Sequence, residues 1–402
     1  TGAASDRVNV GSNASVTTNT GGTVNAINAL LTINGGTTGT DLLAVDDSGD
    51  TVANTDGQLT GTGLGGLGMS NGIAYSDIEE LLLDLGSAGD VFQVLSTHAG
   101  LTTIKGNDGD DVVNVRSTAT GSTTSIFGED GEDTVNISNV SPVQPSQADN
   151  TVGNIDNING LVVINGGLED DTINIDDSAN AADKTGVLTA TTLRGLELEG
   201  GVDYTEAEDL NIWLGTGTDT FFIDSTHAGS TQLYTGDGNA TPGQRDDTVA
   251  IRSVSGTTTV HGQAGNDGIL VNVDYDGGIP PLVGTDAAND AQFVRTHENN
   301  IGAVLNLHGE GGSDHYTLNL AGTGDALINV HDNGASADGD DTLVINGADG
   351  VPGVNNQPDD TFLLRRDIVA LLNDSNPGDQ TDFDRVERVN YDGNINAGLI
   401  VN

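Results

Sequence analysis

Glycine-rich turns that carry several carboxylates recur along this sequence, and each leads directly into a short run of alternating apolar residues. The clearest are Gly106–Asp111, followed by Val112–Val115, and Gly128–Asp133, followed by Thr134–Ile137. Calcium binds six to eight oxygen ligands, mainly carboxylates and backbone carbonyls, in flexible geometry. Glycine allows a turn the backbone conformations that bring several carbonyls toward one point. These residue types at this spacing therefore predict cation sites at the turns, which we call the acidic turns.

The composition favours ligation over simple solvation of the surface. The chain has 402 residues and a net charge of −48, and 48 of its 60 acidic residues are Asp. Glu solvates a surface as well as Asp does, but Asp is also a turn former and a compact ligand. The alternative is that the Asp bias reflects turn chemistry in a protein from a salty environment. Lysine occurs only at Lys105 and Lys184, so nucleic acid and anionic membranes are poor partners.

Several classes of protein are disfavoured. The chain has no cysteine, so a fold held by disulfides is excluded, whereas one stiffened by metal ions is not. No apolar run approaches the ~20 residues of a membrane-spanning helix, so we expect no membrane insertion. No signal peptide is recognisable, and we expect a mature form or a fragment.

The elements that position the acidic turns are short strands. Each turn is preceded by an apolar strand, such as Leu101–Ile104 or Leu161–Ile164, and a Ser-, Thr- and Gly-rich corner such as Arg116–Thr124 follows the next strand. One cycle of two strands and two corners takes about 20 residues. We therefore predict an all-β protein, a parallel β-solenoid. It would be right-handed, similar to a β-helix or β-roll, and its coils would bury apolar side chains only by stacking.

A larger repeat is superimposed on the coils. LLTINGG at Leu30–Gly36 matches LVVINGG at Leu161–Gly167. Residues 141–150 and 276–300 carry prolines and lose the strand pattern, so we expect loops or insertions there. One continuous solenoid of three units, each of about 130 residues, is therefore expected: 1–133, 134–267 and a more diverged 268–402.

At the acidic turns the chain resembles the repeats-in-toxin (RTX) calcium-binding family, whose nonapeptide is G-G-x-G-x-D-x-U-x with U large and apolar. Three segments fit except at the second glycine: Gly106–Asn114 with Asn107 there, Gly128–Asn136 with Glu129, and Gly262–Leu270 with Gln263. In that family the first turn residues give carbonyls, and the Asp gives a carboxylate, to calcium ions held between neighbouring turns. The resemblance implicates Asp111, Asp133 and Asp267 most strongly.

Stacking of the coils supplies a physical reason for a cation. Carboxylates one strand spacing apart repel by about 1 kcal/mol in water and by more in a shielded corner, and a divalent ion between them reverses the sign. Magnesium retains its waters and zinc prefers His or Cys, so calcium is the predicted cofactor. The predicted ligands are Asp108, Asp111, Asp130, Asp133, Asp171, Asp219, Asp247, Asp267, Asp314 and Asp341, with the turn glycines Gly106, Gly109, Gly128, Gly131, Gly262 and Gly265.

The resemblance is incomplete, and this limits what it implies. RTX nonapeptides follow one another directly, whereas here only about one corner of each coil is acidic. The chain is therefore similar to the repetitive parts of very large secreted bacterial adhesins and surface proteins, and no toxin activity is implied. We predict an extracellular, cell-surface structural protein, a calcium-stabilised solenoid that forms a fibre or part of a giant repetitive protein. A carbohydrate- or cell-binding adhesin module, with a glycan partner, is the alternative, although aromatics make up only 3% of residues.

The two ends of the sequence are complementary in pattern. Leu399–Asn402 reads as a strand that would run into an acidic turn, and Thr1–Val10 reads as such a turn and its strand. We therefore predict that copies continue one another head to tail, as separate subunits or as parts of a longer chain. An arbitrary boundary of the sequence is the alternative.

Other polar residues have structural interpretations. His98 and His227 occupy equivalent positions in two STHAG segments, and we expect each to fix a corner by hydrogen bonds. A polysaccharide-acting β-helix enzyme is the second alternative function. Only 12 residues are Lys or Arg, and no Ser–His–Asp or paired-Glu arrangement is readable, so we predict no enzymatic activity. The clustered Arg365, Arg366, Arg385 and Arg388 are expected to form ion pairs, and a carbohydrate or polyanion contact is the alternative.

Overall fold

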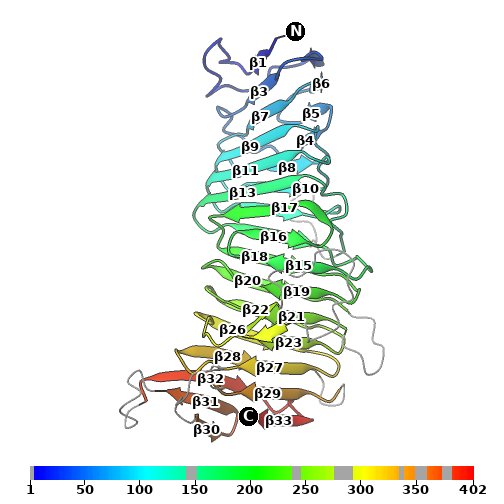
Figure 1. Ribbon diagram of the computed structural model, residues 1–402. Helices are drawn as coiled ribbons and strands as arrows, with labels where there is room; N and C mark the ends of the chain where they lie inside the picture. Colours follow the sequence, from blue (N-terminus) through cyan, green and yellow to red (C-terminus); the bar gives the residue numbers. More distant parts are fainter. Residues whose placement is uncertain are drawn as a thin grey trace. The chain divides into compact units, whose positions relative to one another are not determined.

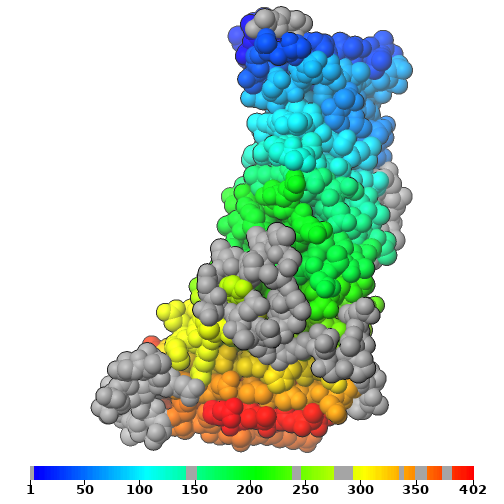
Figure 2. Space-filling model, turned by 45° about the vertical axis from the view of Figure 1, so that its right-hand side comes forward, coloured from blue at the N-terminus to red at the C-terminus, as the bar shows by residue number. Residues whose placement is uncertain are grey.

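The computed structural model describes residues 4–141, 152–237, 246–275, 293–334, 339–348, 360–373 and 383–402. All of its regular elements are β-strands, and within the described residues no helix is long and apolar enough to cross a membrane. The predicted parallel β-solenoid is confirmed (Figure 1). Two compact units can be distinguished, 1–177 with 197–211, and 178–196 with 212–402. Within each unit the coils follow one another in chain order (Figure 2).

In the first unit two sheets face each other. One sheet has the order β1 (Arg7–Val10), β3 (Leu42–Asp46), β7 (Glu80–Asp84), β9 (Leu101–Asp108), β11 (Thr123–Asp130), β13 (Leu161–Leu168) and β17 (Leu198–Thr205). The other has the order β2 (Leu31–Asn34), β6 (Ile73–Ser76), β5 (Gly63–Gly65), β4 (Gly57–Thr60), β8 (Val91–Val94), β10 (Val112–Val115), β12 (Thr134–Ile137), β14 (Thr172–Asp176) and β18 (Asp209–Trp213).

The second unit repeats the two-sheet arrangement. One sheet has the order β16 (Thr192–Gly195), β15 (Thr185–Leu188), β19 (Thr220–Ile223), β21 (Thr248–Ile251), β23 (Gly268–Val271), β27 (His315–Asn319), β29 (Thr342–Asn346) and β33 (Gly398–Val401). The other has the order β20 (Ser230–Tyr234), β22 (Thr258–His261), β26 (Val304–His308), β28 (Ala326–Val330), β32 (Arg385–Tyr391), β31 (Ile368–Asn373) and β30 (Thr361–Arg365). A separate antiparallel pair consists of β24 (Val273–Tyr275) and β25 (Phe293–Arg295).

Successive coils stack in register, so that equivalent residues form columns. Val113 pairs with Val135, and Val135 pairs with Ile173, along β10, β12 and β14. All three side chains are at most 5% exposed. Because side chains alternate between the faces of a strand, every second residue of each coil enters the space between the two sheets. The core is therefore a stack of thin apolar layers, and the solenoid has two sheet faces.

Coil length varies more than the sequence pattern predicts. Equivalent residues lie 21 and 22 positions apart from Asp90 to Asp111 to Asp133, but 38 apart from Asp133 to Asp171 and 47 apart from Asp267 to Asp314. The expected period of about 20 residues holds only where both corners are short. Longer coils contain insertions, because only the paired strands must keep the stacking register.

Some insertions add antiparallel strands that the sequence analysis did not anticipate. Strand β5 pairs antiparallel with both β4 and β6, and β15 pairs antiparallel with β16. Strand β31 pairs antiparallel with both β30 and β32. Of the predicted loops, 142–150 and 276–292 lie outside the described residues. At the end of the second predicted loop, Phe293–Arg295 forms strand β25.

Candidate metal centre

The aspartate that ends each acidic turn is hydrogen bonded to its equivalent in the neighbouring coil. The backbone N–H of Asp111 donates to Asp133 Oδ1 at 2.8 Å, and that of Asp133 donates to Asp171 Oδ1 at 2.8 Å. In the second unit the same bond links Asp219 to Asp247, Asp247 to Asp267, Asp267 to Asp314 and Asp314 to Asp341, at 2.7 to 3.0 Å. We call these residues the aspartate ladder: Asp111, Asp133, Asp171, Asp219, Asp247, Asp267, Asp314 and Asp341, each at most 5% exposed.

The second carboxylate oxygen of most ladder residues has no partner. Oδ2 is buried without a hydrogen bond in Asp111, Asp133, Asp171, Asp247, Asp267 and Asp314. Removing a polar atom from water without a compensating bond is costly, and native proteins rarely tolerate it. Each of these oxygens therefore needs a proton or a cation.

Turn glycines leave room for the free oxygens. A methyl group added to Gly106 would overlap Asp111 Oδ2 and come within 2.6 Å of the carbonyl oxygen of Gly128 in the next coil. One added to Gly262 would lie 2.8 Å from Asp267 Oδ2 and 2.6 Å from the Gly309 carbonyl oxygen. A carboxylate oxygen and a carbonyl oxygen thus face the same small space, which is the donor chemistry of a calcium site. Gly128 has the same relation to Asp133 Oδ2.

The remaining predicted ligands lie elsewhere in the turn. Asp108 and Asp130 end strands β9 and β11, are register partners of each other and are exposed. Gly109, Gly131 and Gly265 have φ angles of 110°, 141° and 156°, and the first of them donates its N–H to the Asp130 carbonyl at 2.8 Å. These glycines shape the turn. The structure does not bring Asp108 or Asp130 to the buried oxygens of the ladder.

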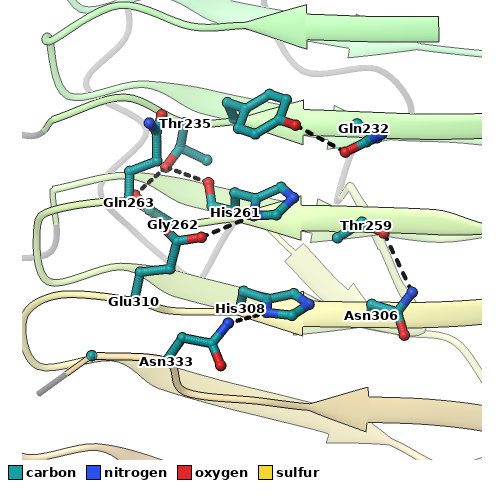
Figure 3. Close-up of polar contacts among 12 residues, drawn as sticks. Gln232, Thr235, Thr259, His261, Gly262, Gln263, Asn306, His308, Glu310 and Asn333 are labelled. Carbon is teal, nitrogen blue, oxygen red and sulfur yellow. Dashed lines mark hydrogen bonds and ion pairs between the residues drawn. The ribbon is translucent and has the colours of Figure 1, made fainter.

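The residues that follow the first glycine of the acidic turns keep a glycine-like backbone. Asn107, Glu129, Gln263 and Glu310 have φ angles of 75°, 78°, 63° and 70°, in the left-handed region. Their side chains reach back to the preceding coil. Glu129 Oε1 lies 2.7 Å from Lys105 Nζ, and Glu310 Oε1 lies 2.9 Å from His261 Nδ1 (Figure 3). The turn shape is therefore retained while a contact between coils is gained.

One group of three carboxylates converges in the second unit. Asp314, Asp332 and Asp341 each place an oxygen within 4.8 Å of the other two, and no other trio of metal-binding side chains does so in the described part of the chain. All three are at most 4% exposed. The sequence analysis named Asp314 and Asp341 but missed Asp332, which follows strand β28. The acid–glycine turn Asp332–Gly334 was the available signal.

The electrostatics of the ladder match its geometry. Burial, reinforced by neighbouring carboxylates, raises the pKa of Asp133 to about 6, of Asp171, Asp314 and Asp332 to about 7, of Asp111 to about 8 and of Asp247 to about 9. The pKa of Asp267 is raised well above its usual range for the same reasons. Burial thus disfavours the charged form of these carboxyls, and a positive charge nearby would favour it.

Other residue types continue the hydrogen-bond pattern. Asp90 donates its N–H to Asp111 Oδ1 at 2.6 Å, and Asp171 donates to Glu208 Oε2 at 2.9 Å. In the second unit the Lys184 N–H donates to Asp219 Oδ1 at 2.7 Å. Asp90, Glu208 and Lys184 are not among the ligands predicted from the sequence.

The histidines and arginines take structural positions. His98 Nδ1 lies 3.5 Å from Thr102 Oγ1, and His227 Nδ1 lies 3.3 Å from Thr231 Oγ1, so the expected corner hydrogen bonds are confirmed. The side chain of Arg366 is 94% exposed and lies 3.4 Å from Asp367. Such a surface pair contributes little stability.

Comparison with protein-family models and with curated proteins finds no match for this chain. The similarity to RTX repeats therefore depends on the turn residues themselves.

Proposed function

We propose that this chain is a calcium-stabilised structural β-solenoid of an extracellular, cell-surface protein. The observation that carries the proposal is the column of buried, unpartnered aspartate oxygens, repeated coil after coil. In Asp111, Asp133 and Asp267 this oxygen lies beside a backbone carbonyl of the next coil. Carboxylates and carbonyls from adjacent coils are hard oxygen donors, which suits calcium better than zinc. The similarity of the acidic turns to RTX repeats supports the same ion.

The ion would couple folding to location. Without it, stacked carboxylates must retain protons or repel one another, and both weaken the stack near neutral pH. A ligand that binds only the folded state stabilises that state in proportion to the logarithm of its concentration. Because calcium is scarce in the cytosol and abundant outside, the chain would be exported unfolded and fold on exit.

Unpaired strand edges support assembly. Among the described strands, β30 pairs only with its antiparallel neighbour β31. By contrast, β4 and β15 each have an antiparallel neighbour (β5 and β16) and also pair in parallel with a strand of the next coil, β8 and β19 respectively. An incoming strand therefore fits beside β30. We propose that β1 supplies it, from a second copy or from an adjacent segment of a longer chain.

Circular dichroism and thermal unfolding in calcium and in chelator test the proposal. We expect chelator to weaken the β signal or lower its melting temperature, and the melting temperature to rise steeply with calcium concentration. An unchanged melting temperature in chelator would refute calcium stabilisation. Electron microscopy in calcium tests assembly, since particles that never lengthen as concentration rises would exclude pairing at β30.

A further inference from the structure

A tyrosine stands in the apolar core directly beside the three converging aspartates. Tyr316 lies on β27, where its register partners in the adjacent coils are Ile269 and Leu343. It is 0% exposed, and apart from the nearby backbone N–H of Gly309 its Oη has no hydrogen-bond partner. Phe or Leu would fill this position without burying a hydroxyl whose hydrogen-bonding capacity is incompletely used, which costs about 1–3 kcal/mol. The phenol oxygen is therefore available to a ligand.

That oxygen is directed toward the carboxylates. A methyl group added to Gly309 would overlap both Tyr316 Oη and Asp314 Oδ2, so the two oxygens border one space. After burial, the charges of Asp314, Asp332 and Asp341 are the causes that raise the pKa of the phenol. Asp314 Oδ2 and Asp332 Oδ2 are themselves buried and unpartnered.

Three carboxylates converge at this point. Asp314, Asp332 and Asp341 each place an oxygen within 4.8 Å of the other two. Asp332 does not belong to the ladder, and Tyr316 stands where the preceding coil places the apolar Ile269. The arrangement therefore adds two oxygen donors, Asp332 and Tyr316, to the ladder residues Asp314 and Asp341.

We propose that Asp314, Asp332, Asp341 and Tyr316 form a closed centre for one hard, oxygen-preferring cation. Three carboxylates and a phenol oxygen suit calcium or a trivalent ion of similar size. The centre binds its ion more tightly than the ladder does, because it gathers three carboxylates where a ladder space offers one carboxylate and one carbonyl. The inference shares its class of ion, and the ladder residues Asp314 and Asp341, with the proposed function, but it does not depend on ion binding elsewhere in the ladder.

Terbium luminescence on the whole chain tests the centre. Terbium is a calcium-sized trivalent ion whose emission is excited through an aromatic ring only at very short range. We expect a tight phase of tyrosine-excited emission equivalent to one ion, which calcium displaces. Tyr316→Phe should abolish that phase. Asp332→Asn should weaken its affinity by about 10- to 100-fold.

Two variants serve as controls. Tyr204→Phe removes another buried tyrosine hydroxyl, and Asp133→Asn alters the ladder in the first unit, so both should leave the tight phase unchanged. Full emission from Tyr316→Phe, or unchanged affinity in Asp332→Asn, would overturn the centre. If the tight phase behaves as expected but calcium does not raise the melting temperature, the centre stands and the proposed function fails.

Discussion

Replacing Asp111 by Asn should destabilise the protein in calcium but stabilise it when calcium is removed. Asn retains Oδ1, which accepts the N–H of Asp90, and places an uncharged amide where Oδ2 faces the Gly128 carbonyl. In chelator the variant should be the more stable protein, because it no longer needs to bury a proton or a charge. In calcium it should be the less stable protein, because a ligand is lost.

The magnitude follows from the pKa of Asp111. Burial raises it from 3.8 to about 8, so between these values the folded state binds a proton that the unfolded state releases. The stabilising contribution of the proton on Asp111 is therefore complete below about pH 4 and is lost as the pH rises toward 8. One such proton changes the free energy of unfolding by about 1.4 kcal/mol per pH unit. Between about pH 5 and 7 the wild type should lose up to about 3 kcal/mol more than Asp111→Asn.

Urea unfolding at a series of pH values, in chelator and in saturating calcium, measures this difference. The other ladder aspartates titrate in both proteins, so only the difference between the two slopes is interpreted. We expect that calcium flattens the wild-type pH profile, because the ion replaces the protons. Parallel pH profiles for the two proteins in chelator would refute the reasoning about the buried oxygen.

Three further predictions concern individual side chains. Gly128→Ala should destabilise the protein by about 3 kcal/mol, because the methyl group would overlap Asp133 Oδ2 and the Gly166 carbonyl. As a control, Gly393→Ala, whose methyl group would meet nothing within 4 Å, should change the free energy of unfolding by less than about 0.5 kcal/mol. Glu387 is 0% exposed and accepts the N–H groups of Ala321 and Thr323 at 2.8 and 3.1 Å, so Glu387→Gln should cost about 1–3 kcal/mol in thermal unfolding, unlike the exposed Glu199→Gln. Burial, together with the charges of His261 and His331, lowers the pKa of His308. The contribution of neutral His308 to stability is therefore present above about pH 6.5 and is lost on acidification. In calcium-saturated protein, His308→Gln should reduce the stability that is lost between about pH 7 and 5, and an unchanged loss of stability would contradict this.

Local sequence patterns predicted the strands and turns. Which residues of different coils meet depends on how the coils stack, and this cannot be read from local sequence. The alternation around Val113 and the glycines around Asp111 each encode a local geometry, so the coil and its acidic corner could be read directly. Asp332 and Tyr316 could not be assigned to a site, because they meet only after coils of unequal length have stacked. Nothing local to Asp267 indicates that its partner lies 47 residues later, at Asp314.

The ladder itself contains a comparison that separates its two roles. The N–H of Asp341 donates to Asn396 Oδ1 at 2.9 Å, so an amide oxygen is sufficient to continue the hydrogen bonds between coils. If that bond were the whole purpose of the column, Asn would serve at Asp111 or Asp247 without a buried charge and its desolvation cost. The chain instead uses carboxylates there, and their second oxygens are buried without a hydrogen-bond partner. One oxygen holds the backbone register, and the other is the oxygen that the proposed ion would bind.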